Sequence, residues 1–323
     1  MKPDLSVNIA GIRMENPIMP ASGCFGYGEE MAQFFDLSLL GAVVTKGTTL
    51  EPREGNDPPR MIETRAGIIN FIGLQNPGIE VVIREKMPFL RKFDVPVVAN
   101  IAGRTIDDYV NVVRIIERAA DWCKPDAIEV NISCPNVKKG GMAFGQDPDV
   151  AAELVACVRK TTSISLIVKL TPNVTDIVAV ARAVVQAGAN ALSLINTLKS
   201  RAKIWRGPSA GKWVVGGLSG PAIRPVAVQK VFEVAEAKLG VPIIGMGGIQ
   251  FLEDALEFFE AGADAIAIGT ANFVNPMVMP ELIKALEGYM VKENFATIQD
   301  LKRGKKQSPT AAASKKGEKG EKR

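Results

Sequence analysis

Short, almost uninterrupted hydrophobic segments recur along the chain, and each is followed by polar or glycine residues. Those with the length of a strand lie at 17–22, 41–46, 95–101, 126–132, 165–170, 190–196, 241–247 and 264–270. Strands that are apolar on both faces are typical of a parallel sheet that is covered on both sides. The pattern therefore predicts eight parallel strands.

Helical patterns, with apolar residues three or four positions apart, lie between most of these strands. They predict helices at 105–122, 147–162, 175–188, 220–240 and 251–263. Asp147 and Pro148 predict the N-cap and first residue of one helix, and Gly188 predicts the end of the next. Eight strands with helical crossovers favour an α/β fold of the (β/α)8 TIM-barrel type. The alternative is an open doubly wound sheet, but no GxGxxG motif follows the first strand.

Three segments fall outside this repeat. Residues 5–17 predict a β-hairpin that caps the lower end of the barrel. The connections 47–94 and 197–219 are long, and we expect them to be irregular, with a helix only near the end of the first. Long connections of this kind usually carry function.

Composition narrows the class of protein. The chain has 323 residues, 47% of them hydrophobic, which is enough for one large domain over 1–301. It has no apolar run long enough to cross a bilayer, and its N-terminus does not resemble a signal peptide. The four cysteines form no CxxC pair, which favours free thiols in a reducing cytoplasm.

Histidine is absent from the sequence, which removes the commonest general base and the commonest metal ligand. Acid/base chemistry must then use Cys, Lys, Tyr or a carboxylate, and we expect no metal site. Residues 302–323 carry a net charge of +7, so residues 1–301 carry −3 of the total of +4. We expect this lysine-rich tail to be disordered and solubilising, and do not expect it to bind nucleic acid or membrane.

The predicted strands all end in polar or glycine residues. In chain order these are Ser22, Lys46, Asn100, Asn131, Lys169, Asn196, Gly247 with Gly248, and Gly269 with Thr270. A single polar end is most often a cap or a turn. Because the active sites of these barrels form where the strands end, eight such ends together predict a binding site at one mouth.

Glycines and lysines indicate what this mouth could bind. The glycines after the last two strands predict a phosphate site, and Gly220, just before Pro221, offers a further helix start. Lys46 and Lys169 would favour an electron-rich or anionic group, such as a reduced flavin or a carboxylate. The alternative is that both lysines simply lie on the surface.

Cys134 follows the fourth strand, at the start of a glycine-rich loop that runs to Gln146. A buried structural thiol is the usual interpretation of a lone cysteine, and Cys24, Cys123 and Cys157 fit it. Cys134 differs because it lies at the predicted mouth. With no histidine present it is a candidate proton acceptor, and its loop is a candidate lid.

These motifs resemble the catalytic subunits of class 1B dihydroorotate dehydrogenases over most of residues 5–285. The matching segments are "NPIMPASGCFGYG" (16–28), "VVTKGTTLEPREGNDPPRMIET" (43–64), "NFIGLQNPGIE" (70–80), "VNISCPNVKKGGMAFGQDP" (130–148), "VKLTPNVTDI" (168–177), "LINTLKS" (194–200), "GGLSGPAIRPVA" (216–227), "IGMGGI" (244–249) and "AIAIGTANF" (265–273). The resemblance implies an FMN enzyme that oxidises (S)-dihydroorotate to orotate in pyrimidine (UMP) biosynthesis. Cys134 would take the C5 proton, and the flavin N5 would take the C6 hydride.

The resemblance also implies contacts, residue by residue. For FMN these are Ser22, Lys46, Gly47, Asn100, Asn131, Lys169, Ile195, Gly220, Gly247, Gly248, Gly269 and Thr270. For the substrate they are Lys46, Asn70, Phe71, Ile72, Gly73, Leu74, Asn131, Asn196 and Thr197.

Partners are implied in the same way. The family pairs a homodimer core with a subunit that carries FAD and an iron–sulfur cluster, giving a heterotetramer that passes electrons to NAD. This chain has no cysteine cluster and no dinucleotide motif, so another chain would have to supply both. Residues 201–215 and the tail depart from the family pattern.

Three other functions stay open from the residues alone. One is a related FMN enzyme that resembles dihydropyrimidine dehydrogenase. Another is a non-redox barrel that binds a sugar phosphate. The third is a binding or scaffold protein that has lost catalysis, which the intact set of polar strand ends disfavours.

Overall fold

A computed structural model describes residues 2–133, 144–205 and 209–306. Its largest sheet has eight parallel strands, in the order β3-β14-β13-β10-β9-β8-β7-β4. Their bounds are β3 Ile18–Pro20, β4 Val43–Val44, β7 Val97–Ile101, β8 Ala127–Asn131, β9 Ser165–Lys169, β10 Ala191–Leu194, β13 Ile243–Met246 and β14 Ala265–Ile268. The Gly41 amide donates to the Ile18 carbonyl at 2.8 Å and links the two outermost strands. The sheet is therefore a nearly closed ring, which confirms the predicted barrel.

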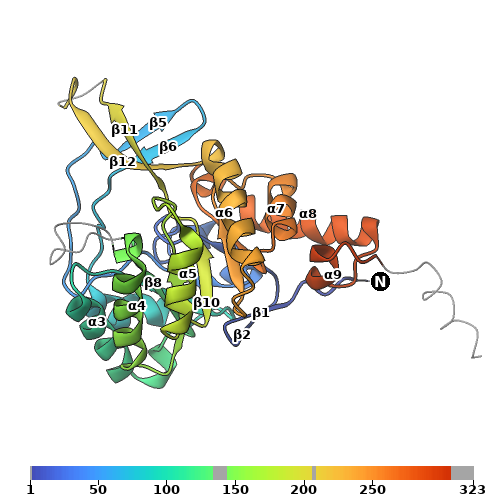
Figure 1. The fold of residues 1–323 in the computed structure, drawn as a ribbon, viewed down its shortest axis with the longest axis horizontal. Helices are drawn as coiled ribbons and strands as arrows, with labels where there is room; N and C mark the ends of the chain where they lie inside the picture. The colour runs from blue at the N-terminus through green and yellow to red at the C-terminus, as the bar shows by residue number, and fades with distance from the viewer. Residues whose placement is uncertain (1, 134–143, 206–208, 307–323) are drawn as a thin grey trace, which may run out of the picture.

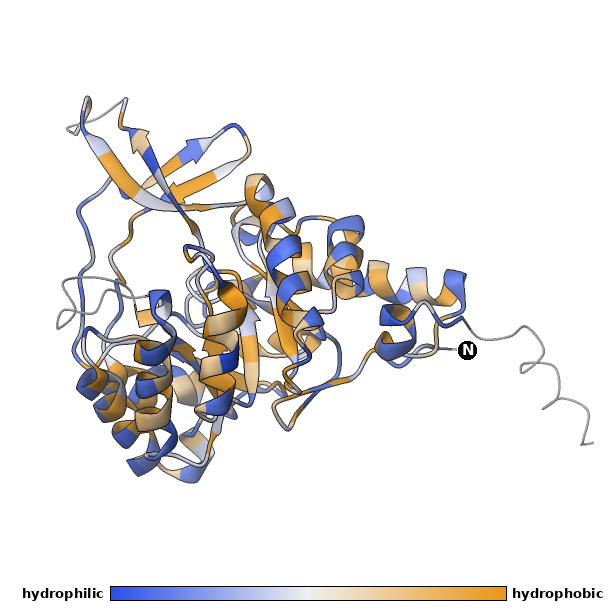
Figure 2. Cartoon of the chain, viewed as in Figure 1, coloured by the Kyte–Doolittle hydropathy of each residue, from blue (hydrophilic) through white to orange (hydrophobic). Residues whose placement is uncertain are grey.

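Helices surround this ring, with their hydrophilic faces outward (Figures 1 and 2). Their bounds are α1 Ile79–Val81, η3 Val82–Lys86, α2 Met87–Leu90, α3 Ile106–Arg118, α4 Pro148–Arg159, α5 Ile177–Gln186, α6 Arg224–Glu236, α7 Leu252–Glu260, α8 Val278–Glu293 and α9 Ile298–Lys302. Shorter turns are η1 Met31–Gln33, η2 Leu37–Leu39, η4 Asp121–Cys123, η6 Phe144–Gln146, η7 Pro221–Ile223 and η8 Thr270–Phe273. No described helix could span a membrane.

The predicted helices are all present, and their caps follow the sequence. Asp147 accepts hydrogen bonds from the amides of Asp149 and Val150, and Pro148 is the first residue of α4. The sequence pattern did not predict α8 or α9. The amide of Asp4 donates to the carbonyl of Ala296 at 2.8 Å, so the start of the chain lies beside α9 (Figure 1).

The N-terminal hairpin closes the lower end of the ring, as predicted. It consists of β1, Val7–Ile9, and β2, Ile12–Met14. Ile9 and Met14 are buried in the same apolar cluster as the inward side chains of the barrel strands. Ser165 Oγ, at the start of β9, donates to the carbonyl of Ala10 at 2.6 Å. Ligands must therefore enter at the opposite end, where the strands finish.

The two long connections are irregular only in part, so this expectation was partly wrong, although the helix predicted near the end of the first is present between Ile79 and Leu90. They form a second sheet from β5, Met61–Thr64; β6, Gly67–Asn70; β11, Leu198–Lys203; and β12, Trp213–Ser219. All its strands are antiparallel, and it stands beyond the barrel mouth (Figure 1). A side-chain carbon on Gly216 would lie 2.5 Å from the carbonyl oxygen of Asn70. The pairing of β12 with β6 thus requires glycine, a residue that weakens the sequence signal of a strand.

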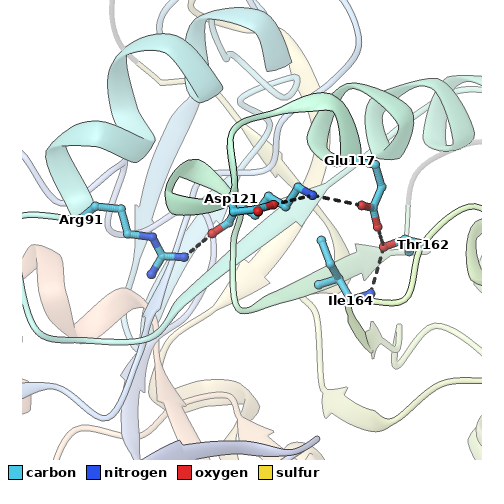
Figure 3. Close-up of polar contacts among 6 residues, drawn as sticks. Arg91, Glu117, Asp121, Thr162 and Ile164 are labelled. Carbon is cyan, nitrogen blue, oxygen red and sulfur yellow. Dashed lines mark hydrogen bonds and ion pairs between the residues drawn. The ribbon is translucent and has the colours of Figure 1, made fainter.

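A chain of polar contacts ties α3 to the lower ends of neighbouring strands (Figure 3). Glu117 on α3 accepts a hydrogen bond from Thr162, just before β9, and pairs with Lys124 at 3.6 Å. Lys124 lies just before β8, pairs with Asp121 at 3.1 Å, and accepts a hydrogen bond from Arg91 through its carbonyl oxygen. These contacts lie at the end of the barrel away from the mouth, so we assign them a structural role.

We expect Met14→Ala to lower the free energy of unfolding by about 2–5 kcal/mol, because it leaves a cavity in the plug of the barrel. Urea unfolding followed by intrinsic fluorescence measures this. Arg13→Ala is the matched control on the same strand, since Arg13 pairs with exposed Glu15 and should change stability by less than about 0.5 kcal/mol. Equal midpoints for the two variants would show that the hairpin is not part of the cooperative core.

Candidate functional site

The barrel interior changes from apolar to polar just below the mouth. Alternate residues of a strand face the same side. On β7, β8, β9 and β10 the inward residue is apolar at one position and polar two residues later. The four pairs are Val98 and Asn100, Ala127 and Glu129, Ile167 and Lys169, and Ala191 and Ser193. All four polar side chains are buried, with at most 4% of each residue exposed. The floor of the mouth is therefore a layer of hydrogen-bonding groups.

Lys169 joins opposite walls of this layer. It is the last residue of β9, and its Nζ donates to Ser22 Oγ, after β3, at 3.0 Å. The two strands are four places apart in the ring of eight, so this bond spans the barrel. The structure brings these two predicted residues together and shows that Lys169 is not on the surface.

Lys46 lies at the mouth beside a thiol. Burial lowers the pKa of Lys46, Cys24 raises it, and Arg60 lowers it further. Burial likewise raises the pKa of the Cys24 thiol, while Lys169 and Lys46 lower it. Lys46 and Lys169 therefore both lie near the Cys24 thiol. Cys24 lies at the mouth, whereas the sequence pattern suggested an ordinary buried thiol in the core.

Asn100 presents a free acceptor to the mouth. Its Nδ2 donates to Glu129 Oε2 at 2.5 Å, while its Oδ1 is buried with no partner among the described residues. A side-chain carbon on Gly47 would lie 2.9 Å from this oxygen and 3.6 Å from Leu74. Asn100, Gly47 and Leu74, all predicted to bind the cofactor or the substrate, thus lie close together at the mouth.

A second group of predicted residues meets after β8 and β10. Asn196 Nδ2 donates to Asn131 Oδ1 at 3.3 Å and to Ser133 Oγ at 2.9 Å. The Thr197 amide donates to Asn196 Oδ1 at 2.8 Å, and the Tyr109 hydroxyl donates to the carbonyl of Asn131 at 2.6 Å. The two asparagines are thereby held in fixed orientations.

Residues 70–74 leave the second sheet and run toward the mouth. Asn70 Nδ2 donates to the carbonyl of Gly217 at 3.3 Å. The carbonyls of Phe71 and Ile72 accept from Asn56, at 2.6 Å from its side chain and 2.9 Å from its amide. Phe71 and Ile72 are thus held by their own loop, whereas Leu74 lies beside Gly47.

Asn76 fixes this segment to the barrel. It is buried, and its Nδ2 donates to the carbonyl of Leu74 at 2.7 Å. Its Oδ1 accepts from the amides of Thr49, just past β4, and Gly78.

Glycines shape the side of the mouth after β13 and β14. A side-chain carbon on Gly248 would lie 2.9 Å from the carbonyl of Gly220, and one on Gly247 would lie 3.5 Å from Ile195. Gly248 also has φ of +79°, which favours glycine. Gly269 directly follows β14, and Thr270 Oγ1 donates to Ser219 Oγ at 2.8 Å. Close packing against the protein therefore requires glycine at Gly248, and these loops lie where barrels of this kind usually bind a phosphate.

Cys134 and its loop, residues 134–143, lie outside the described residues. Both flanks are anchored, because Ser133 accepts from Asn196 and the Gly145 amide donates to the carbonyl of Ile132 at 2.8 Å. Phe144 is buried against Tyr109, with ring centroids 5.6 Å apart.

The sequence patterns missed Glu129, Tyr109 and Asn76. Glu129 had a usable signal, because it is the one carboxylate within the apolar segment that forms β8. Tyr109 bonds Asn131 and Asn76 bonds Thr49, and these contacts between residues distant in sequence follow only from the fold.

Comparison with known proteins gives a consistent family. A family model described as dihydroorotate dehydrogenase matches residues 4–290. The chain is 55% identical over 283 residues to a Geobacillus kaustophilus protein named dihydroorotate dehydrogenase B (NAD(+)), catalytic subunit, covering 87% of this chain and 89% of that protein. Proteins of the same name from Geotalea daltonii and Listeria monocytogenes are 50% identical, covering 93% of this chain and 97% of each relative.

We expect Lys46→Met to stabilise the protein without ligand at pH 7, by about 1 kcal/mol or roughly 2 °C in melting temperature. Because burial lowers the pKa of Lys46 in the folded state, the charged lysine costs stability below that pKa. The cost disappears as the pH rises above 10.5, where lysine is neutral in both states, so the advantage of the variant should disappear too. Thermal melts at pH 7 and at alkaline pH measure this.

Exposed Lys199→Met is the control and should leave the melting temperature unchanged. A lower melting temperature for Lys46→Met at pH 7 would contradict the assignment of Lys46 as a destabilising charge.

Proposed function

The chain belongs to the dihydroorotate dehydrogenase family and is an oxidoreductase, and we propose that it uses FMN to oxidise (S)-dihydroorotate to orotate. The observation that carries this proposal is the buried polar floor of the mouth. Asn100 Oδ1 has no partner there among the described residues, and two lysines converge on the same place. The product would enter pyrimidine biosynthesis.

The residues at the mouth fit a bound flavin. Flavins of this family carry a phosphate and a ring with both donor and acceptor edges. Gly220, Gly247, Gly248, Gly269 and Thr270 would hold the phosphate, because the loops after the last two strands are the usual phosphate site of such barrels. Ser22, Lys46, Gly47, Asn100, Asn131, Lys169 and Ile195 would hold the ring. When bound, FMN supplies the acceptor for the hydride that leaves C6 of the substrate.

The substrate would lie between this floor and the segment after β6. Lys46 Nζ would bind its carboxylate, while the amides of Asn70, Asn131 and Asn196 would bind its ring amides. Phe71, Ile72, Gly73, Leu74 and Thr197 would complete the wall. The fixed orientations of Asn131 and Asn196 support this assignment, since a preoriented amide distinguishes donor from acceptor.

We assign the proton transfer to Cys134. Its thiolate would take the proton from C5 as the hydride leaves C6, so that a C5–C6 double bond forms. Cys134 follows Ser133, which is bonded to Asn196, and the chain contains no histidine that could serve instead. A lysine charge beside this thiol would favour its thiolate form.

The electrons would pass to NAD through a second subunit. The similar proteins are named as NAD-dependent catalytic subunits, a name that implies a further chain. The sequence has no cysteine cluster and no dinucleotide motif, so we propose that FAD and an iron–sulfur cluster belong to that partner. We propose a homodimer core within a heterotetramer, located in the cytoplasm.

We expect Cys134→Ala to retain FMN but to lose turnover by about 10²–10⁴-fold, the usual contribution of a general base. Cys134→Ser should keep part of the activity, with its pH profile shifted upward because a hydroxyl is a weaker acid than a thiol. Steady-state oxidation of dihydroorotate with an artificial acceptor, together with the flavin absorbance, measures both. Cys123→Ala, which removes a buried thiol at the lower end, is the control. Near-normal turnover in Cys134→Ala would exclude this base.

We expect the isolated chain to reduce artificial dyes but not NAD, and to gain NAD reduction when it is co-expressed with an iron–sulfur flavoprotein that acts as its partner subunit. The mass of the purified complex tests the heterotetramer. Rapid reduction of fumarate by the isolated chain would instead favour an enzyme that needs no partner. Preference for dihydrouracil over dihydroorotate would move the assignment to a dihydropyrimidine dehydrogenase-like enzyme.

A further inference from the structure

We propose that Glu129 is a positioning residue that holds the Asn100 amide with its oxygen toward the cofactor, so that this point of the floor can only accept a hydrogen bond. The inference rests on the proposed binding of FMN and goes beyond it. No sequence motif pointed to Glu129. Among the described residues it bonds none of the predicted substrate residues and none of the glycines after β13 and β14, which we call the glycine cradle.

The two side chains lie on adjacent strands. Asn100 of β7 and Glu129 of β8 are paired in register, and both point into the barrel. A carboxylate oxygen only accepts hydrogen bonds, so the atom of Asn100 that lies 2.5 Å from Glu129 Oε2 must be the amide nitrogen. The other end of the amide, Oδ1, is then turned away from Glu129.

Glu129 is itself fixed from a second strand. Its Oε1 accepts from Ser193 Oγ, on β10, at 2.7 Å. Glu129 is 2% exposed, and Ser193 is fully buried. The carboxylate is therefore held at both oxygens by neutral donors, which keeps it in one rotamer and keeps Asn100 in one orientation.

The orientation has a chemical consequence at the mouth. Asn100 Oδ1 is buried and has no partner among the described residues. The pyrimidine edge of oxidised isoalloxazine presents two carbonyl oxygens and one donor, the N3–H group. Lys46 and Lys169 can only donate, so they suit the carbonyl oxygens, while Asn100 Oδ1 suits N3–H. Glu129 thus makes Asn100 complementary to the one donor of that edge.

A purely structural role for Glu129 makes a different prediction. If the carboxylate only filled space or tied strands together, its loss would weaken the binding of every flavin equally. If it orients Asn100, its loss should weaken FMN but leave a flavin without N3–H almost unaffected. The analogue 3-methyl-FMN separates the two cases.

The test measures dissociation constants of FMN and 3-methyl-FMN for the apoprotein, from the quenching of flavin fluorescence. We expect Glu129→Leu to bind FMN about tenfold more weakly, the scale of one buried hydrogen bond, and 3-methyl-FMN less than threefold more weakly. Glu129→Gln is the conservative control. Its carbonyl can still accept from Asn100 while its amide donates to Ser193, so FMN affinity should stay within about threefold of wild type.

A second pair of variants covers the case in which Glu129→Leu does not fold. Asn100→Asp sets two carboxylates against each other and should weaken FMN binding more than tenfold. Adding Glu129→Gln should restore it to within about threefold of wild type, since the introduced glutamine amide can donate to one oxygen of the new aspartate and leave the other facing the flavin.

Equal weakening of both flavins by Glu129→Leu, or a double variant no better than Asn100→Asp alone, would overturn the role of Glu129. Failure of the wild-type apoprotein to bind FMN at all would instead overturn the proposed function.

Discussion

A closed ring of parallel strands forces every second side chain into an interior that water cannot fill, and each buried polar group there must find a partner. The lower interior of this barrel meets that demand with apolar residues and a hairpin plug. The upper interior does not, because Asn100, Glu129, Lys169 and Ser193 replace the apolar layer. Asn100 and Ser193 bond Glu129 from nearby strands, Lys169 bonds Ser22 across the ring, and what these groups leave unpaired defines what the mouth can bind.

The walls of the mouth come from segments that are far apart in the chain. The second sheet joins β6 to β12, whose paired residues Asn70 and Gly217 are separated by 147 positions. It carries the segment with Leu74 to a point beside Gly47, while Asn76 fixes that segment to the end of β4. The floor is thus rigid and set by strand register, whereas the wall depends on two loops that stabilise each other. Such an arrangement can keep one cofactor site while the substrate wall varies.

How far the sequence predicts this structure depends on the range of the interactions involved. The barrel strands are continuous apolar runs, so their positions and the polar residues at their ends could be predicted from local pattern. The second sheet could not, because its strands alternate weakly, contain Gly216 and Gly217, and pair with a distant segment. Glu129 shows the same limit within a correctly predicted strand. Its residue type was visible, but its partners lie on two other strands, and only the register of the ring places them together. Cys134 was predicted as a proton acceptor from its place after the fourth strand and the absence of histidine, and then from motif resemblance, but its position lies outside the described residues.

The polar floor also links cofactor binding to stability. Lys46 is half-buried with a lowered pKa, and Asn100 Oδ1 is a buried acceptor with no partner among the described residues, so both raise the free energy of the empty mouth. A ligand that supplies an acceptor to the lysine and a donor to the asparagine removes both penalties at once, and it stabilises the folded chain in proportion to its affinity. The features that disfavour the empty barrel are therefore those that select its ligand. A flavin ring meets both needs along a single edge, whereas a sugar phosphate would satisfy the glycine cradle and leave the floor unpaired.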